Sequence, residues 1–265
     1  ARAALAQIEH YMFFEGGTEI HTGDLVVQSQ EATAYFGEEE TSLERLELRG
    51  DATVRTSDGT LREMQASEIT LLFEETTRQF GGATLSGRAH IELSGNDEIG
   101  SSIDATTVSV SMTPSGLDVM TLDATGDVHL YLPRHGIQPE QQIRSEHLAG
   151  RGTPEAGLTT LRFEHGVEYR ESSDNTSLDA NQTRVITAER LEAGADPSLG
   201  SLPMAAFRGN VLFEDDDRRV EAPLIAYDVI SGLLTLGIIS HDDSPVIEDD
   251  ATPDVTQDVS PNTEP

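Results

Sequence analysis

Apolar and polar residues alternate over long stretches of the chain. In residues 45–55 every second position, beginning at Leu46, is apolar or glycine, and the positions between are charged or polar. A period of two places alternate side chains on opposite faces of a strand, so this stretch predicts a half-buried β-strand. Because no window shows the 3.6-residue period of an amphipathic helix, the pattern as a whole predicts an all-β fold.

The same strand pattern recurs at regular spacing. Its central positions are Gly50, Gly87, Gly126, His165 and Gly209, which lie 37, 39, 39 and 44 residues apart, and a weaker first copy surrounds Gly16. Between copies lies a second pattern, in which a small residue is followed three positions later by an apolar one, as with Ala66 and Ile69. A gap of three breaks the period of two and predicts a bulge or bend in that strand. The chain is therefore expected to contain about six two-stranded repeats.

Repeats with one apolar side bury that side only by stacking on one another. We therefore expect an elongated double sheet or trough with an apolar inner face. The predicted inner positions are Leu46, Leu48, Val54, Ile69, Leu71, Phe73, Leu85, Ile91, Val108, Val110, Leu122, Val128, Phe163, Val167, Phe207, Val211 and Ile225.

The glycines at the strand centres and the small residues of the second pattern are also expected on this inner face, and they have two interpretations. Glycine at a strand centre can relieve crowding where two sheets approach, which predicts a dry, ligand-free structural or adhesive solenoid. Alternatively, the inner face is incompletely filled and admits a long apolar ligand. Burying an acyl chain of about twelve methylenes contributes on the order of 10 kcal/mol, so a groove without specific polar groups is enough to hold it. The open ends of the sheet offer backbone groups to a partner's strand.

Charge and composition narrow the range of partners. The chain has 48 acidic residues and 17 basic ones, all arginine, for a formal charge of −31. Such a charge repels phosphate backbones, so we expect no nucleic-acid partner. The absence of cysteine excludes disulfides and thiolate metal sites. The apolar pattern ends near residue 240, so we divide the chain into repeats at 1–240 and an acidic tail, expected to be disordered, at 241–265.

No motif for catalysis or metal binding stands out. The histidines form no H-E-x-x-H pattern, and the acidic clusters Glu38–Glu40, Asp215–Asp217 and Asp242–Asp243 lack the spacing of a calcium loop. His165 takes an inward glycine position and is expected to be a satisfied buried histidine, or else to contact a ligand phosphate. A carbohydrate-active β-helix enzyme would need carboxylates converging on one face, whereas the outward acidic positions are interspersed with Arg and Thr. We therefore expect no enzyme, no catalytic residues, no metal and no cofactor.

The repeat has a recognisable form. A strand of the type Leu-x-Leu-x-Gly-x-Ala/Val-x-Val/Ile is followed by a strand of the type Ala-x-x-Ile/Leu, most clearly in residues 207–215 and 220–236. Over roughly residues 12–237 this pattern resembles the OstA-like domain of the lipopolysaccharide-transport proteins LptA and LptC.

The resemblance implies a specific fold, location and role. The fold would be an open β-jellyroll in the periplasm of Gram-negative bacteria, with lipopolysaccharide acyl chains in its interior at the seventeen inner positions. Its partners would be lipopolysaccharide, other OstA-like proteins joined end to end by strand addition, and an inner-membrane ABC transporter complex. LptC-type members also have an N-terminal membrane helix, so an inner-membrane anchor absent from this chain is compatible with the resemblance, as is either an LptA-like or an LptC-like role.

Overall fold

The computed structural model describes residues 2–6, 10–37, 42–94, 100–134, 136, 138–174, 181–196, 199–216 and 218–237. Within these ranges every regular element is a β-strand, which confirms the predicted all-β class. The described residues form no helix that is long and apolar enough to cross a membrane. The predicted tail at 241–265 lies outside the described residues. The strands are β1 (Arg2–Ala6), β2 (Tyr11–Thr22), β3 (Leu25–Phe36), β4 (Leu43–Thr56), β5 (Leu61–Phe73), β6 (Phe80–Leu93), β7 (Ser101–Met112), β8 (Val119–Leu132), β9 (Glu140–Thr153), β10 (Gly157–Asp174), β11 (Asn181–Gly194), β12 (Met204–Glu214), β13 (Arg219–Asp228) and β14 (Leu233–Gly237).

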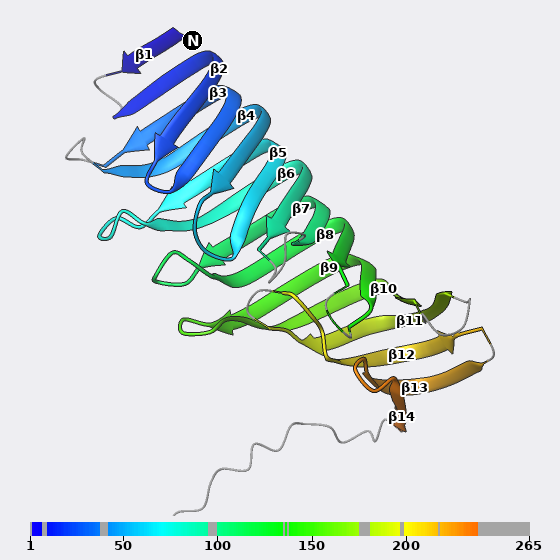
Figure 1. The fold of residues 1–265 in the computed structure, drawn as a ribbon. Helices are drawn as coiled ribbons and strands as arrows, with labels where there is room; N and C mark the ends of the chain where they lie inside the picture. The colour runs from blue at the N-terminus through cyan, green and yellow to red at the C-terminus, as the bar shows by residue number, and fades with distance from the viewer. Residues whose placement is uncertain are drawn as a thin grey trace, which may run out of the picture.

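The fourteen strands form one open antiparallel sheet in the order of the chain. Each strand pairs with the strand before it and the strand after it, so β1 and β14 are the two edges. The sheet is long and narrow, and Figure 1 shows its strands arching over along one side of the molecule. Tight turns at 75–78 and 231–232 join β5 to β6 and β13 to β14.

The arch follows a line of residues with left-handed backbone conformation. Each even-numbered strand from β2 to β12 has two consecutive residues with positive φ at its centre. These pairs are Gly16–Gly17, Gly50–Asp51, Gly87–Arg88, Gly126–Asp127, His165–Gly166 and Gly209–Asn210. The register of every neighbouring odd-numbered strand shifts at the same level, so the pairs line up across the sheet as one bend.

Gly126 shows why the sequence places glycine at this bend. Its φ is +78°, and a Cβ there would lie 2.5 Å from Oγ1 of Thr106 on β7. The ladder pairs Thr125 with Thr107 before the bend and His129 with Asp104 after it. Between these pairs β8 has three residues, 126–128, and β7 has two, 105–106, so β8 carries one extra residue. The predicted bend is thus present, but the extra residue lies on the glycine-bearing strand, because only there does the backbone turn left-handed.

The bend divides the sheet into two half-sheets that face each other. Half-sheet A contains the strand halves on the side of Ala89–Leu93 of β6, and half-sheet B contains those on the side of Phe80–Ser86. Contacts cross the space between them: the rings of Tyr169 on half-sheet A and Phe207 on half-sheet B lie 5.5 Å apart, centroid to centroid. The edge opposite the bend, where the strands end in turns and loops, is the mouth of the fold.

The core fills the space between the half-sheets. Of the seventeen predicted inner positions, all are buried except Phe73, which is half-buried because it is the last residue of β5 and lies at the mouth. His165 differs from its expected place: it is exposed, with φ of +67°, because it belongs to the bend rather than to the inner face.

Candidate functional site

The inner face from β3 to β9 is almost purely aliphatic. Its buried apolar side chains are Leu, Ile, Val, Ala and Met, with no aromatic ring among the described residues. Leu46, Leu71, Leu85 and Ile91 are completely buried here. We call this part of the interior the aliphatic segment. It provides a mainly aliphatic surface along seven of the fourteen strands, with the buried polar side chains Ser29, Ser101, Gln141 and Ser145 among its residues.

A pocket of about 380 Å³ opens at the mouth beside the aliphatic segment. Its apolar lining comes from Leu25, Leu61, Phe73, Phe80 and Met112, and its rim includes Asp24, Asp58, Arg78 and Leu117. This volume is in the range of small-ligand pockets. The mouth pocket therefore lies directly against core residues of the aliphatic segment such as Leu61.

Two contacts close the mouth on one side of this pocket. The backbone N–H of Thr60, in the β4–β5 turn, donates to the carbonyl of Leu117, in the β7–β8 turn, at 2.9 Å. Farther along, Leu199, between β11 and β12, lies against β7, where Ser101 Oγ donates to the Leu199 carbonyl at 2.5 Å. Leu199 and Leu202 are 0% and 1% exposed, so this loop seals the core at the mouth.

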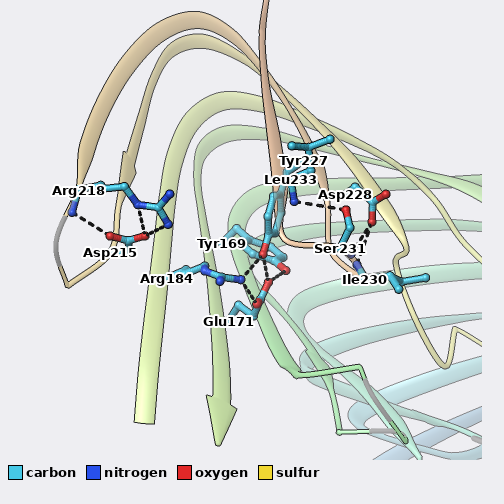
Figure 2. A network of polar contacts seen from close by, with 10 residues as sticks. All are labelled: Tyr169, Glu171, Arg184, Asp215, Arg218, Tyr227, Asp228, Ile230, Ser231 and Leu233. Carbon is cyan, nitrogen blue, oxygen red and sulfur yellow. Dashed lines mark hydrogen bonds and ion pairs between the residues drawn. The ribbon is translucent and has the colours of Figure 1, made fainter. Parts of the chain in front are cut away.

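Beyond β9 the interior becomes aromatic and charged. Four residues form a hydrogen-bonded group that we call the clasp: Tyr169 and Glu171 on β10, Arg184 on β11 and Tyr227 on β13. Glu171 Oε2 accepts from the hydroxyls of Tyr227 at 2.7 Å and Tyr169 at 3.0 Å. Arg184 Nη1 donates to Glu171 Oε1 at 2.9 Å and to the Tyr227 hydroxyl at 2.8 Å (Figure 2). The clasp therefore joins half-sheet A to Tyr227 on half-sheet B.

Burial and charge shape the protonation of the clasp. Burial, with the nearby Glu171 carboxylate, raises the pKa of Tyr169 and of Tyr227 well above the ordinary tyrosine value. Burial alone would lower the pKa of Arg184, but Tyr227 and Glu171 outweigh it and raise that pKa. The clasp thus contains a guanidinium and two neutral phenols around a carboxylate that is only 2% exposed.

A fifth polar residue extends the clasp toward the aliphatic segment. Gln141 on β9 pairs in register with Glu171 on one side and with Leu132 on the other. It is 1% exposed, and its buried Oε1 has no hydrogen-bond partner in the part of the chain that the structure describes. Leu132, Gln141, Glu171 and Arg184 are thus neighbours on successive strands, β8 to β11, and form one inward row across the sheet. Along this row the side chain changes from aliphatic to amide, carboxylate and guanidinium.

A second pocket, of about 430 Å³, lies over β9 to β13. Its floor consists largely of small residues, including Ala149, Gly194, Ala206 and Ala226, and Arg151 contributes a guanidinium. Its lining also includes the buried core residues Leu161, Ala193 and Ala205, so this pocket reaches the core at β10 to β12, beyond the aliphatic segment.

The sites considered for metals gain no support from the described residues. No group of three or more His, Asp or Glu side chains in the described ranges is arranged to hold a metal ion. The clusters Glu38–Glu40 and Asp242–Asp243 and the residue Asp217 lie outside those ranges. Asp215 contacts its neighbour in the β12–β13 turn, where Arg218 Nη2 donates to its Oδ2 at 2.6 Å (Figure 2).

The free edge β14 is held by a tight turn. The carboxylate of Asp228 accepts the backbone N–H groups of Ile230 and Ser231, both at 3.0 Å, and the hydrogen bonds from Ser231 and Ile230 lower the pKa of Asp228 (Figure 2). On β14, Leu233 and Leu236 are 62% and 57% exposed. This edge thus presents both unpaired backbone groups and apolar side chains.

Comparison with protein-family models, curated proteins and solved structures finds no match to this chain.

Proposed function

We propose that this chain is a non-enzymatic lipopolysaccharide carrier of the OstA-like type that works in the periplasm. In this proposal the fold is an elongated β-jellyroll of about six two-stranded repeats, and its interior holds acyl chains and passes them between membranes. The observation that supports it most is the aliphatic segment, a mainly aliphatic inner face beside a mouth pocket with apolar residues in its lining.

The energetics are compatible with lipid loading. An acyl chain of about twelve methylenes gains on the order of 10 kcal/mol on leaving water. Across the mouth, the half-sheets meet through non-covalent contacts such as the Thr60–Leu117 hydrogen bond. An acyl chain replaces contacts between the half-sheets with contacts of the same apolar kind, so the net cost of opening is small compared with that gain. No cofactor or catalytic group is needed, and the energy for directed transport comes from an inner-membrane ABC transporter complex.

The edges of the sheet support the proposed partners. β1 and β14 are unpaired on one side, and β14 exposes Leu233 and Leu236. Strand addition at such edges joins this chain end to end with other OstA-like proteins. The formal charge of −31 keeps nucleic acid out of the set of partners.

A ligand-free structural or adhesive solenoid is the alternative. The observation that favours it is the density of the interior, where residues such as Leu46, Leu85 and Val128 are 0% or 1% exposed. In that case the core would stay closed and the mouth pocket would have no ligand.

Binding of fluorescent lipopolysaccharide to three variants distinguishes the two functions. Phe73→Glu places a carboxylate at the lip of the mouth pocket, where the side chain is half-buried rather than inside the core. We expect at least about tenfold weaker binding. Leu85→Glu places the charge inside the aliphatic segment and should abolish binding. Arg49→Ala removes an exposed outer-face side chain, paired with Glu47 at 3.9 Å, and should change affinity less than about twofold. Equal binding by Phe73→Glu and Arg49→Ala would overturn the assignment of the interior as the lipid site.

A further inference from the structure

The interior changes character between β9 and β10. On its N-terminal side, the buried apolar residues of the described strands β3 to β9 are aliphatic. On its C-terminal side, the largest buried side chains are the rings of Phe163, Tyr169, Phe207, Phe213 and Tyr227. Edge-to-face contacts join Tyr169 to Phe207 and to Tyr227, with centroids 5.5 and 6.2 Å apart. Because edge-to-face ring pairs have a preferred geometry, the half-sheets separate less readily here than where flexible aliphatic side chains meet.

The clasp stands at this transition and crosses the interior. Figure 2 shows the hydroxyls of Tyr169 and Tyr227 and the guanidinium of Arg184 converging on Glu171. An acyl chain that passed between Glu171 and Tyr227 would have to break their 2.7 Å hydrogen bond and lie against a buried carboxylate. A desolvated charge without its partners is strongly unfavourable, so a lipid tail cannot replace these contacts as it can replace apolar ones.

Gln141 gives the same boundary a polar face toward the aliphatic segment. Its unpartnered Oε1 lies one strand before Glu171 in the inward row. An aliphatic chain has no donor to offer this oxygen, whereas a hydroxyl or an amide has one. The last position that suits an acyl chain in this row is therefore Leu132.

We propose that the clasp is a stop that ends the acyl-binding part of the interior at β9. This inference rests on the proposed function and restricts it. Acyl chains occupy the aliphatic segment, while Phe163, Val167, Phe207, Val211 and Ile225 form a lipid-free C-terminal block. That block keeps the end of the sheet rigid next to the exposed edge strand β14.

Photocrosslinking at phenylalanine positions tests the stop directly. A photoactivatable phenylalanine analogue replaces Phe73, at the mouth pocket, or Phe207, beyond the clasp, in the full chain loaded with purified lipopolysaccharide. We expect the crosslink yield at Phe207 to be at least about tenfold lower than at Phe73. The same two positions are then compared in a variant with an apolar clasp, Tyr169→Phe, Glu171→Leu, Arg184→Met and Tyr227→Phe. There the yield at Phe207 should rise to within about threefold of the yield at Phe73.

The outcomes separate the stop from the proposed function. Equal yields at both positions in the unaltered chain would overturn the stop and leave the carrier function standing. No crosslink at Phe73 or Phe207 would overturn the carrier function, and the stop with it. A low yield at Phe207 that persists in a folded apolar-clasp variant would show that the clasp is not the barrier. If that variant does not fold, the comparison in the unaltered chain still decides whether the interior is divided.

Discussion

Removing Arg184 alone should destabilise the fold far more than removing an exposed arginine from the same region. In Arg184→Met the Glu171 carboxylate, 2% exposed, loses the one cationic partner it has among the described residues, whose Nη1 lies 2.9 Å from Oε1. At that distance and an effective dielectric constant of about 20, the lost attraction is about 6 kcal/mol before desolvation is counted. Removing one partner of a buried ion pair lowers the free energy of unfolding by about 3–5 kcal/mol. Because the hydroxyls of Tyr169 and Tyr227 still donate to Glu171, we expect a loss of about 3 kcal/mol.

Two variants serve as controls for this value. Arg170→Met, on the same strand as Glu171, removes an ion pair with Glu168 whose arginine side chain is 50% exposed and whose N–O distance is 2.7 Å. Exposed pairs contribute less than about 1 kcal/mol, so this variant should be nearly neutral. The apolar-clasp variant removes the carboxylate together with its partners and should lie within about 1 kcal/mol of the unaltered chain.

Urea unfolding followed by circular dichroism measures all three free energies of unfolding, with the dependence on urea unchanged among them. A loss below about 1 kcal/mol in Arg184→Met would mean that Glu171 is not a desolvated carboxylate. If the apolar-clasp variant loses as much free energy of unfolding as Arg184→Met, an uncompensated charge on Glu171 is not the cause. The loss would then come from removing the clasp as a whole.

Three further perturbations test the bend, the clasp and the seal of the mouth. Gly166→Ala should lower the free energy of unfolding in urea by about 1 kcal/mol, and Gly126→Ala should lower it by more. Both glycines have positive φ, but of the two only Gly126 has a side chain close to the added Cβ. Equal losses would mean that steric contact does not contribute at the bend. Tyr169 and Tyr227 have raised pKa values in the folded state, so their stabilising contribution is full below the unfolded value near 10 and is lost as pH rises through the folded values. A phenolate absorbance titration should therefore show a late component that disappears when both are changed to Phe, and an unchanged titration would contradict it. Leu202→Ala should destabilise the fold by about 2–3 kcal/mol in urea unfolding, whereas a neutral effect would mean that the β11–β12 connection does not seal the core.

The alternation of side chains predicted the strands and their inner face. Leu46, Leu48 and Val54 are buried because a period of two assigns them to one side, and the spacing of glycines marked the bend. The same parity contains the signal for the clasp: Glu171 continues the inward series of Val167 and Tyr169. A charged residue in a strand suggests an outward position, and only the partners across the interior explain why this one is buried.

Other features depended on contacts between distant segments. The composition of residues 194–203 predicts a loop, but not that Leu199 would reach Ser101 on β7 and close the mouth. His165 is exposed because the backbone turns left-handed there, and alternation describes only extended backbone. Phe73 is half-buried because β5 ends at the mouth, a boundary that the pattern of apolar residues does not mark.

Native mass spectrometry of the full chain purified from a lipopolysaccharide-producing host tests the carrier function most directly. A lipid carrier should give protein ions with the mass of bound lipid, and lipid A species after solvent extraction, both strongly reduced in Phe73→Glu but not in Arg49→Ala. A chain that is free of lipid and does not bind added lipopolysaccharide would contradict the carrier function and favour the ligand-free solenoid.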